Sequence, residues 1–598
     1  MSINKNIEII TKRINDRSKA LRQKYLKKLG QQKDLSSKAR KNMGCSNLAH
    51  AFAACEKAQQ TQAASGSPII GIINAYNDML SAHEPLKDYP IIIKKTAEKN
   101  NAIARVAAGV PAMCDGITQG ELGMELSLFS RDVIAMSAAI GFSHNVFDAG
   151  ICLGVCDKIV PGLVIGALSF GHLPIGFIPA GPMGTGISNK QKAKNRRDFA
   201  DGKINRSALL ASEQASYHSS GTCTFYGTAN TNQLIIETMG LQLPSCSFTP
   251  PHTEERKLLI EKTVERVLKM NENNIAMGEM LNVKSWINGL VALLASGGST
   301  NLTIHMIAMA RAGGFEITLD DIGELSNIVP TLACVYPNGS ADVNDFHTAG
   351  GVAALIGSLL EGSYLYEDVS TILGEGLSQY RNKLEVDNGE LFWKTKSEIS
   401  DQSIIRDCSN PFNASGGLKT IKGNIGTGII KISALKNSKE VIEAPARVFE
   451  DQEGVIKAFN NNEFESDTII VVRNQGPSSN GMPELHKLTS LIGVLRSRGL
   501  NIALVTDGRM SGASGGFPAV IHLYPEAAKG GNIAKIKNDD LIKIDLESGN
   551  LELGLSSDEL RSRKVNVPET NHQGAGRELF EVFRNSVDGV ETGASVFK

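Results

Sequence analysis

Hydrophobic residues follow a helical period at the start of the chain. Between residues 5 and 40, apolar positions recur three, four or seven residues apart, at Ile7, Ile10, Ile14, Leu21, Tyr25 and Leu29. The same stretch carries 12 lysines and arginines against 3 acidic residues. This spacing predicts an amphipathic helix that packs on the body and exposes a basic face, within a helical arm of residues 1–65. A nucleic-acid or membrane arm is the alternative, which the lack of interleaved stacking aromatic residues disfavours.

From about residue 68 the pattern changes to short apolar runs that end in turns rich in glycine and asparagine. Examples are "PIIGIINAYND", "AIARVAAGVPAMCDG" and "INGLVALLASGGSTN", with helical patterns between them at 121–139 and 253–270. Alternation of strand, turn and helix predicts an α/β domain with a mostly parallel sheet. Sites in such sheets form at the carboxyl ends of the strands, where the polar turns fall.

The run 159–189 contains no charged residue and is long enough to span a bilayer by count alone. It also contains Pro161, Pro174, Pro179 and Pro182. Repeated prolines favour buried strands and turns of a core over a transmembrane helix.

After about residue 400 short β-rich runs dominate, among them "GNIGTGIIKISAL", "DTIIVVRNQG" and "NIALVTDGRMSG". They predict a smaller β-rich domain, a barrel or a sandwich. The stretch "IIRDCSNPFNASGG" is the expected junction, so the predicted domains are residues 1–400 and 401–598.

Composition narrows the class of protein. A chain of 598 residues exceeds the usual size of one domain, and its formal net charge of −1 provides no field that would recruit nucleic acid or an anionic membrane. The polar start after Met1 does not resemble a signal peptide, so we expect a cytoplasmic protein. Nine cysteines, an odd number, do not indicate a disulfide framework, which leaves thiols free for metal binding or catalysis.

Three cysteines lie in polar, turn-like surroundings: Cys114, Cys156 and Cys223. If the fold brings them together, three thiolates suit a soft metal or an iron–sulfur cluster. The alternatives are a structural zinc site and, for each cysteine alone, a small buried hydrophobe. Asp115 and Asp157 directly follow two of these thiols, which an apolar niche would disfavour. The other cysteines are interpreted as core packing: Cys45, Cys55, Cys152, Cys246, Cys334 and Cys408.

Asp115, Asp157 and Glu484 offer the hard oxygen ligands that Mg²⁺ prefers. The turns "GPMGTGIS", "SGGSTN" and "GNIGTG" could present backbone N–H groups to a phosphate, although ordinary turn geometry explains each of them as well. Ser511, in "VTDGRMSGASGG", is a candidate base beside a metal, or a hydroxyl that bonds its own turn.

Taken in order, "CDG", "VCDKIVPG", "GTC", "GGSTN", "GMPE" and "TDGRMSG" resemble the dihydroxy-acid/phosphogluconate dehydratase family, from about residue 68 to the end. The segments "SYHSSGTCTFYGTANTNQ" and "NQGPSSNGMPELHKL" are similar in sequence to those of the phosphogluconate branch of this family.

The resemblance implies an iron–sulfur cluster held by Cys156 and Cys223, with Cys114 as the candidate third ligand. Two-iron relatives carry a cysteine in the turn that here reads "NDMLSAH", where Ala82 or a neighbour stands instead. We therefore expect a four-iron cluster rather than a two-iron one.

The resemblance also implies a Mg²⁺ or Mn²⁺ site formed by Asp115, Asp157, Lys158 and Glu484. The lysine at this position can be carbamylated in relatives, which would turn an amine into a carboxylate-like ligand. Relatives further imply a homodimer.

The implied reaction is the dehydration of 6-phospho-D-gluconate in the Entner–Doudoroff pathway, with Ser511 removing the C2 proton. Candidates for binding this phosphorylated sugar acid are Ser299, Thr300, Asn301, Arg509 and His83. One alternative is a sister dehydratase for an unphosphorylated sugar acid or a dihydroxy acid. Another is an inactive iron–sulfur protein that senses redox state or binds nucleic acid.

Overall fold

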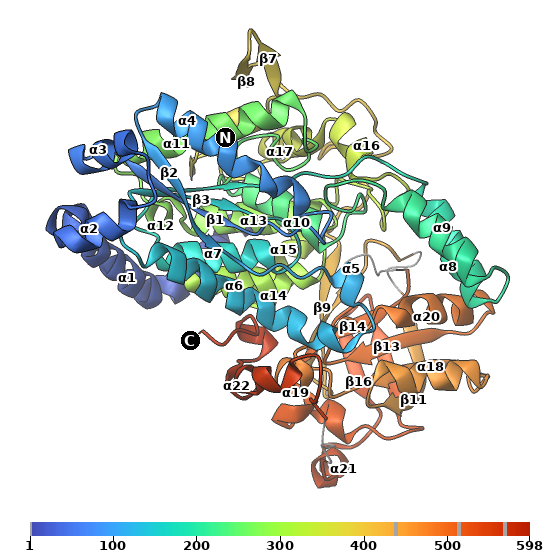
Figure 1. Ribbon diagram of the computed structural model, residues 1–598. Coiled ribbons are helices and arrows are strands. Elements are labelled where there is room, and N and C mark those ends of the chain that lie inside the picture. The colour runs from blue at the N-terminus through green and yellow to red at the C-terminus, as the bar shows by residue number, and fades with distance from the viewer. Residues whose placement is uncertain (1–2, 436–439, 511–515, 566–570, 598) are drawn as a thin grey trace.

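The computed structural model describes residues 3–435, 440–510, 516–565 and 571–597. Its N-terminal domain is built on a four-stranded parallel sheet with strand order β2-β1-β3-β4 (Figure 1). The strands are β1 (Ile69–Asn74), β2 (Ile103–Gly109), β3 (Ala149–Leu153) and β4 (Ile175–Ile178). β1, β3 and β4 are buried along their whole length, which explains their uninterrupted apolar sequences. The predicted α/β domain is confirmed.

Helices cover both faces of this sheet, and strand glycines let them approach closely. A Cβ atom at Gly150 would lie 2.8 Å from the Phe142 ring in α6, and one at Gly176 would lie 2.9 Å from Val267 in α11. The larger helices of the domain are α4 (Tyr89–Lys99), α6 (Ser127–Phe142), α7 (Ile159–Ser169), α10 (Thr228–Thr238), α11 (Glu254–Glu272), α13 (Val283–Ala295), α14 (Asn301–Ala312), α15 (Leu319–Ile328) and α17 (Gly351–Glu361). Its short helices are α5 (Asp115–Thr118), α12 (Met277–Met280) and α16 (Val343–Thr348).

Two apolar runs interpreted as strands and turns form buried helices instead, α7 and α13. Pro161 is tolerated in the first turn of α7, where its missing N–H group is not needed. Gly162 and Gly166 let α7 lie against α6, since a Cβ at Gly162 would come within 2.5 Å of the Arg131 carbonyl oxygen. A helix that is apolar on every side has no amphipathic period, so the pattern did not reveal it.

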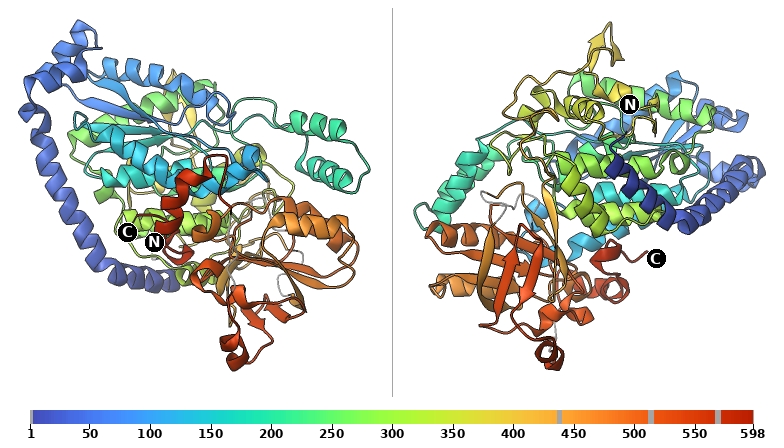
Figure 2. Two further views of the ribbon diagram at one scale, coloured as in Figure 1. Left: turned by 60° about the horizontal axis from the view of Figure 1, so that its bottom comes forward. Right: turned by 180° about the vertical axis from the view of Figure 1, so that it is seen from behind.

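The basic segment at the start of the chain forms the long helix α1 (Lys5–Asn42), which lies along one side of the N-terminal domain (Figure 2). Ile7, Ile10 and Ile14 are buried against the body, as the period predicted. Arg13 and Arg17 on the polar side form ion pairs with the body. Two short helices complete the predicted helical arm, α2 (Cys45–Phe52) and α3 (Lys57–Ser65).

The C-terminal domain contains a closed eight-stranded barrel with strand order β10-β14-β13-β12-β11-β15-β16-β9. Its strands are β9 (Leu418–Lys422), β10 (Thr427–Lys431), β11 (Val441–Phe449), β12 (Thr468–Val472), β13 (Ile502–Thr506), β14 (Ala519–Tyr524), β15 (Leu541–Asp545) and β16 (Asn550–Leu553). In β11, Ile442, Ala444 and Ala446 alternate with exposed residues and point inward, as one-sided burial requires. The predicted smaller β-rich, barrel-like domain is confirmed.

Helices also accompany the barrel, and two small hairpins lie before it. The helices are α18 (Gln452–Asn460), α19 (Pro477–Asn480), α20 (Lys487–Ser497), α21 (Ser557–Ser562) and α22 (Glu581–Ser586). The hairpins pair β5 (Ser370–Thr371) with β6 (Gly374–Glu375) and β7 (Glu385–Asp387) with β8 (Glu390–Phe392). Within the described ranges, no helix is both long enough and apolar enough to cross a membrane.

A helical hairpin that the pattern did not predict projects from the N-terminal domain beside the barrel domain. It consists of α8 (Asn189–Ala200) and α9 (Arg206–Ser216), and α8 contacts α20 (Figure 1). The hairpin thus joins the two domains at the side where the candidate residues gather.

Candidate active site

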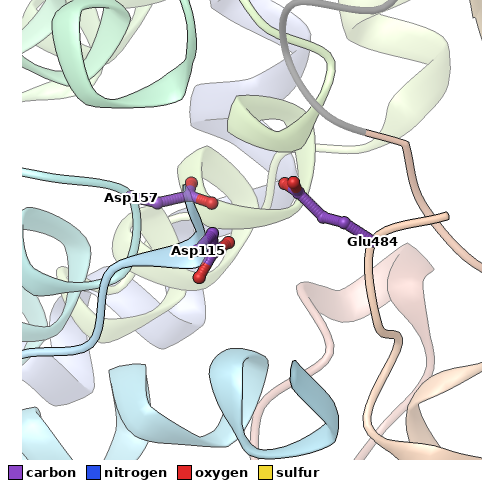
Figure 3. Close-up of side chains that lie close together, drawn as sticks. All are labelled: Asp115, Asp157 and Glu484. Carbon is purple, nitrogen blue, oxygen red and sulfur yellow. The ribbon is translucent and has the colours of Figure 1, made fainter. Parts of the chain in front are cut away.

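The predicted residues gather where strand ends of the two domains face each other. In the N-terminal sheet, Cys114 and Asp115 follow β2, and residues 156–158 follow β3. In the barrel, Glu484 follows β12 and Arg509 follows β13. Figure 3 shows that Asp115 and Asp157 come from one domain and Glu484 from the other. This placement agrees with the rule that open α/β sheets build sites at strand carboxyl ends.

The three thiols Cys114, Cys156 and Cys223 lie close enough to influence one another's ionisation. Burial raises the pKa of the Cys156 thiol well above its usual value, and the other two thiols raise it further. Burial likewise raises the pKa of Cys223 to about 12. Thiolates at such a place require a bound cation, and three sulfur donors fit a soft metal or an iron–sulfur cluster.

Cys156 has a left-handed backbone, with φ of 75°, at the turn between β3 and α7. That conformation is strained for a residue other than glycine and needs support from its surroundings. The Asn232 side chain supplies it, since Nδ2 donates to the carbonyl oxygens of Cys156 and Asp157 at 3.1 and 3.0 Å. The turn thereby presents a thiol and a carboxylate from adjacent residues.

Of the six cysteines interpreted as core packing, Cys55, Cys152 and Cys246 are buried as expected. Cys45 is exposed near the start of α2, so that interpretation was wrong for it. Cys334 and Cys408 are half-buried.

The carboxylates of Asp115, Asp157 and Glu484 converge, with one oxygen of each within 4.8 Å of the others. Lys158 forms ion pairs with both aspartates. Arg509 Nη1 lies 2.7 Å from Glu484 Oε1, and its Nη2 lies 3.3 Å from Asp115 Oδ2. Two cations therefore face three carboxylates in a largely buried pocket.

Burial and charge act in opposite directions on these acids. Although burial opposes the ionisation of Asp157, Lys158 and then His305 and Arg509 hold its pKa well below the usual value. For Glu484 burial prevails, and its pKa is raised. Because Mg²⁺ binds ionised carboxylates, a cation in this pocket would favour the charged form of Glu484.

Neighbouring polar side chains orient the carboxylates, and sequence reasoning missed them. Ser127 Oγ donates to Asp115 Oδ1 at 2.6 Å, and Gln119 Nε2 donates to Glu484 Oε2 at 3.3 Å. Neither residue lies in a recognisable motif. Asn301, predicted as a substrate residue, donates from Nδ2 to Glu484 Oε1 at 2.9 Å.

His305 approaches the pocket from behind, with Nε2 at 3.7 Å from Asp157 Oδ1. Its Nδ1 lies 3.2 Å from Arg131 Nη1. A guanidinium only donates hydrogen bonds, so Nδ1 must accept, and the imidazole proton sits on Nε2 facing Asp157. Burial lowers the pKa of His305 to about 4, consistent with a neutral ring. Its spacing four residues after Asn301 on α14 was the signal that could have found it.

Three other predicted substrate residues are buried in the N-terminal domain. Ser299 is buried and its Oγ lies 2.8 Å from Thr228 Oγ1; Thr300 is also buried, directly before α14. His83 is buried, and its Nδ1 donates to the Ala75 carbonyl oxygen at 2.8 Å. Ser511 lies outside the described residues.

Comparisons with known proteins identify the family of the chain. The family model "Dihydroxy-acid/6-phosphogluconate dehydratase N-terminal" matches residues 67–380, and the corresponding C-terminal model matches residues 403–594. A phosphogluconate dehydratase of Pseudomonas aeruginosa is 51% identical over 98% of both chains, and one of Escherichia coli K12 is 50% identical over 98% of both. A dihydroxy-acid dehydratase of Ignicoccus hospitalis is 34% identical over 83% of this chain and 89% of its own. The chain therefore belongs to the dihydroxy-acid/6-phosphogluconate dehydratase family.

Proposed function

We propose that the protein is a phosphogluconate dehydratase, a hydro-lyase that converts 6-phospho-D-gluconate into 2-dehydro-3-deoxy-6-phospho-D-gluconate and water. The observation that carries this proposal is the convergence of three thiols with three carboxylates at the domain junction. Relatives of that name are about 50% identical over nearly the whole chain, against 34% for the dihydroxy-acid dehydratase. The reaction would serve the Entner–Doudoroff pathway.

Cys114, Cys156 and Cys223 would hold an iron–sulfur cluster, since three neighbouring sulfur donors suit it and leave one iron without a protein ligand. When bound, the cluster supplies a Lewis acid for the departing C3 hydroxyl. We keep the preference for a four-iron cluster as part of the proposal.

Asp115, Asp157 and Glu484 would hold Mg²⁺ or Mn²⁺, because all three offer hard oxygen ligands that converge on the same point. The cation supplies a positive charge that stabilises the enolate-like transition state. Lys158 already touches two of these carboxylates. Its carbamylation would replace a positive charge by a negative one and add a fourth oxygen ligand.

The chain's own residues then perform the proton transfers. Ser511 is the proposed base that takes the C2 proton; the electron pair of that C–H bond forms the C2–C3 double bond, and the C3 hydroxyl leaves as water after it gains a proton. The enol that remains tautomerises to the 2-keto acid. Arg509 pairs with Glu484 and Asp115 and holds these carboxylates in place.

The remaining proposals concern substrate contacts and organisation. Ser299, Thr300, Asn301, His83 and Arg509 are kept as candidate substrate residues. We also propose the division into residues 1–400 and 401–598, and a homodimer.

The experiment is turnover by anaerobically purified protein, with iron and sulfide counted on the same sample. We expect 6-phosphogluconate to yield a 2-keto product and the protein to carry about four irons per chain. D-gluconate and 2,3-dihydroxy-3-methylbutanoate serve as comparison substrates. Faster turnover of either would assign the protein to a sister activity. A colourless protein with zinc and no sulfide would refute the cluster.

A further inference from the structure

Within the described chain, one buried lysine near the thiols has no acidic partner. Lys192 on α8 is 5% exposed, yet among the described residues its Nζ forms neither an ion pair nor a hydrogen bond. Its nearest ring neighbours are Tyr217 and Phe225, with centroids 4.8 and 5.8 Å from Nζ. Aromatic faces offset only a small part of the cost of burying an ammonium group.

The acidic residues around Lys192 are committed to other partners. Both oxygens of Glu213 bind the Arg196 guanidinium, at 2.7 and 2.8 Å. Asp342 accepts the Thr185 hydroxyl at 2.7 Å and also caps α16. Glu213 thus neutralises Arg196 within the fold, while Lys192 is left for an anion from outside.

The surroundings of Lys192 suit a phosphate group. The glycine-rich turn 181–188 leads directly into α8, whose first turn provides the positive end of a helix dipole. Gly184 and Thr185 are exposed, and within the described chain their backbone N–H groups form no hydrogen bond. Lys192 is the fourth residue of α8, so it belongs to the first turn of the helix that follows this glycine-rich segment.

The position of Lys192 near the thiols also suits the phosphate end of the substrate. Phe225, which lies under the ammonium, is two residues beyond Cys223, and the charges of Cys223 and Lys192 influence each other. If C2 and C3 of the sugar acid react at the thiols and carboxylates, the C6 phosphate must extend to a neighbouring cationic group.

We propose that Lys192, together with the turn 181–188 at the amino end of α8, binds the phosphate group of the sugar-acid substrate. This inference rests on the proposed function for the identity of the substrate, although the anion site stands on the contacts of Lys192 itself. Phosphate carries more charge than any other group of this substrate, so the same lysine would select the phosphorylated acid over its unphosphorylated analogue.

The test compares the Lys192→Met variant with Lys190→Met, which removes an exposed lysine from the same helix. Loss of one charge-assisted contact is expected to raise KM for 6-phosphogluconate about 10- to 100-fold, with kcat much less affected. Iron and sulfide contents and turnover of D-gluconate should stay unchanged. The Lys190→Met variant should behave as the wild type.

Inorganic phosphate provides a readout that does not depend on turnover. Calorimetric titration of the cluster-loaded protein should show phosphate binding to the wild type and Lys190→Met, and its loss in Lys192→Met. Methionine fills a similar volume without charge, so without phosphate the Lys192→Met variant should unfold at the wild-type temperature or above.

Two results would overturn the proposal. Unchanged KM and phosphate affinity in Lys192→Met would mean that the lysine binds no phosphate. Loss of iron and sulfide at an unchanged affinity for phosphate would instead make Lys192 the counter-ion of the cluster. A third result separates the two proposals. If the wild type does not turn over 6-phosphogluconate, but binds phosphate and the Lys192→Met variant does not, the proposed function fails while the anion site stands.

Discussion

Replacing Arg509 by methionine should destabilise the metal-free protein and strengthen its binding of Mg²⁺. The guanidinium is 1% exposed and lies 2.7 Å from Glu484, 3.3 Å from Asp115 and 3.5 Å from Asp157. Three carboxylates face Arg509 and Lys158, so the pocket has one excess negative charge, and the substitution leaves two.

The size of the effect follows from burial. Removing one partner of a buried ion pair costs about 3–5 kcal/mol, because the other charge remains without compensation. For a domain of about 200 residues this corresponds to a decrease of roughly 6–20 °C in the unfolding temperature. A bound cation replaces the lost positive charge, so we expect the affinity for Mg²⁺ to rise at least tenfold, ~1.4 kcal/mol.

Thermal unfolding of chelator-treated protein, repeated over a series of MgCl₂ concentrations at constant ionic strength, measures both quantities. Arg509→Lys is the matched control, since it keeps the charge and loses only the forked geometry. It should lose less stability and bind Mg²⁺ as the wild type does. If Arg509→Met unfolds at the wild-type temperature and only raises KM for substrate, Arg509 is a substrate ligand and not the counter-ion of the carboxylates.

Three further outcomes are expected. Burial lowers the pKa of Lys431 from 10.5 to about 7; the unfolded chain therefore binds more protons between pH 7 and 10.5, and wild-type stability rises across that window by up to ~4 kcal/mol. The Lys431→Met variant should lack this rise and be more stable than the wild type near pH 7. Denaturant unfolding measures the free energy of unfolding of both proteins. If the two differ by the same amount at pH 7 and at pH 9.5, the assignment is contradicted. Cys156→Ser and Cys223→Ser should lose iron, sulfide and turnover together. Ser511→Ala should lose turnover and keep the cluster; loss of both would argue against a role as base.

Local patterns were sufficient to predict the two kinds of domain. The apolar runs of β1 and β2 identified strands of the parallel sheet, and the period of α1 identified its packed face, because each signal is carried by consecutive residues. Local patterns did not predict the helices α7 and α13, because both are buried and show no exposed polar face. The α8–α9 hairpin was missed as well.

For the site, sequence reasoning identified residues that stand in recognisable turns. Cys156, Asp157 and Glu484 are of this kind, and the structure places them together with their predicted neighbours. It overlooked His305, although that residue stands four positions after the predicted Asn301 on α14. It could not identify Ser127, because the contact of Ser127 with Asp115 depends on which helix lies beside the pocket. Such contacts are fixed by tertiary packing and leave no local pattern.

Residues 593 and 594, near the end of the chain, contact the residues that lie behind the carboxylate pocket. Gly593 and Ala594 accept hydrogen bonds from the buried Arg131 guanidinium at 2.9 and 2.6 Å through their carbonyl oxygens. Arg131 in turn fixes the tautomer of His305, and His305 directs its proton toward Asp157. Because Arg509 of the barrel domain also contacts Asp157, a series of buried contacts links the end of the chain, the N-terminal domain and the barrel through this one carboxylate.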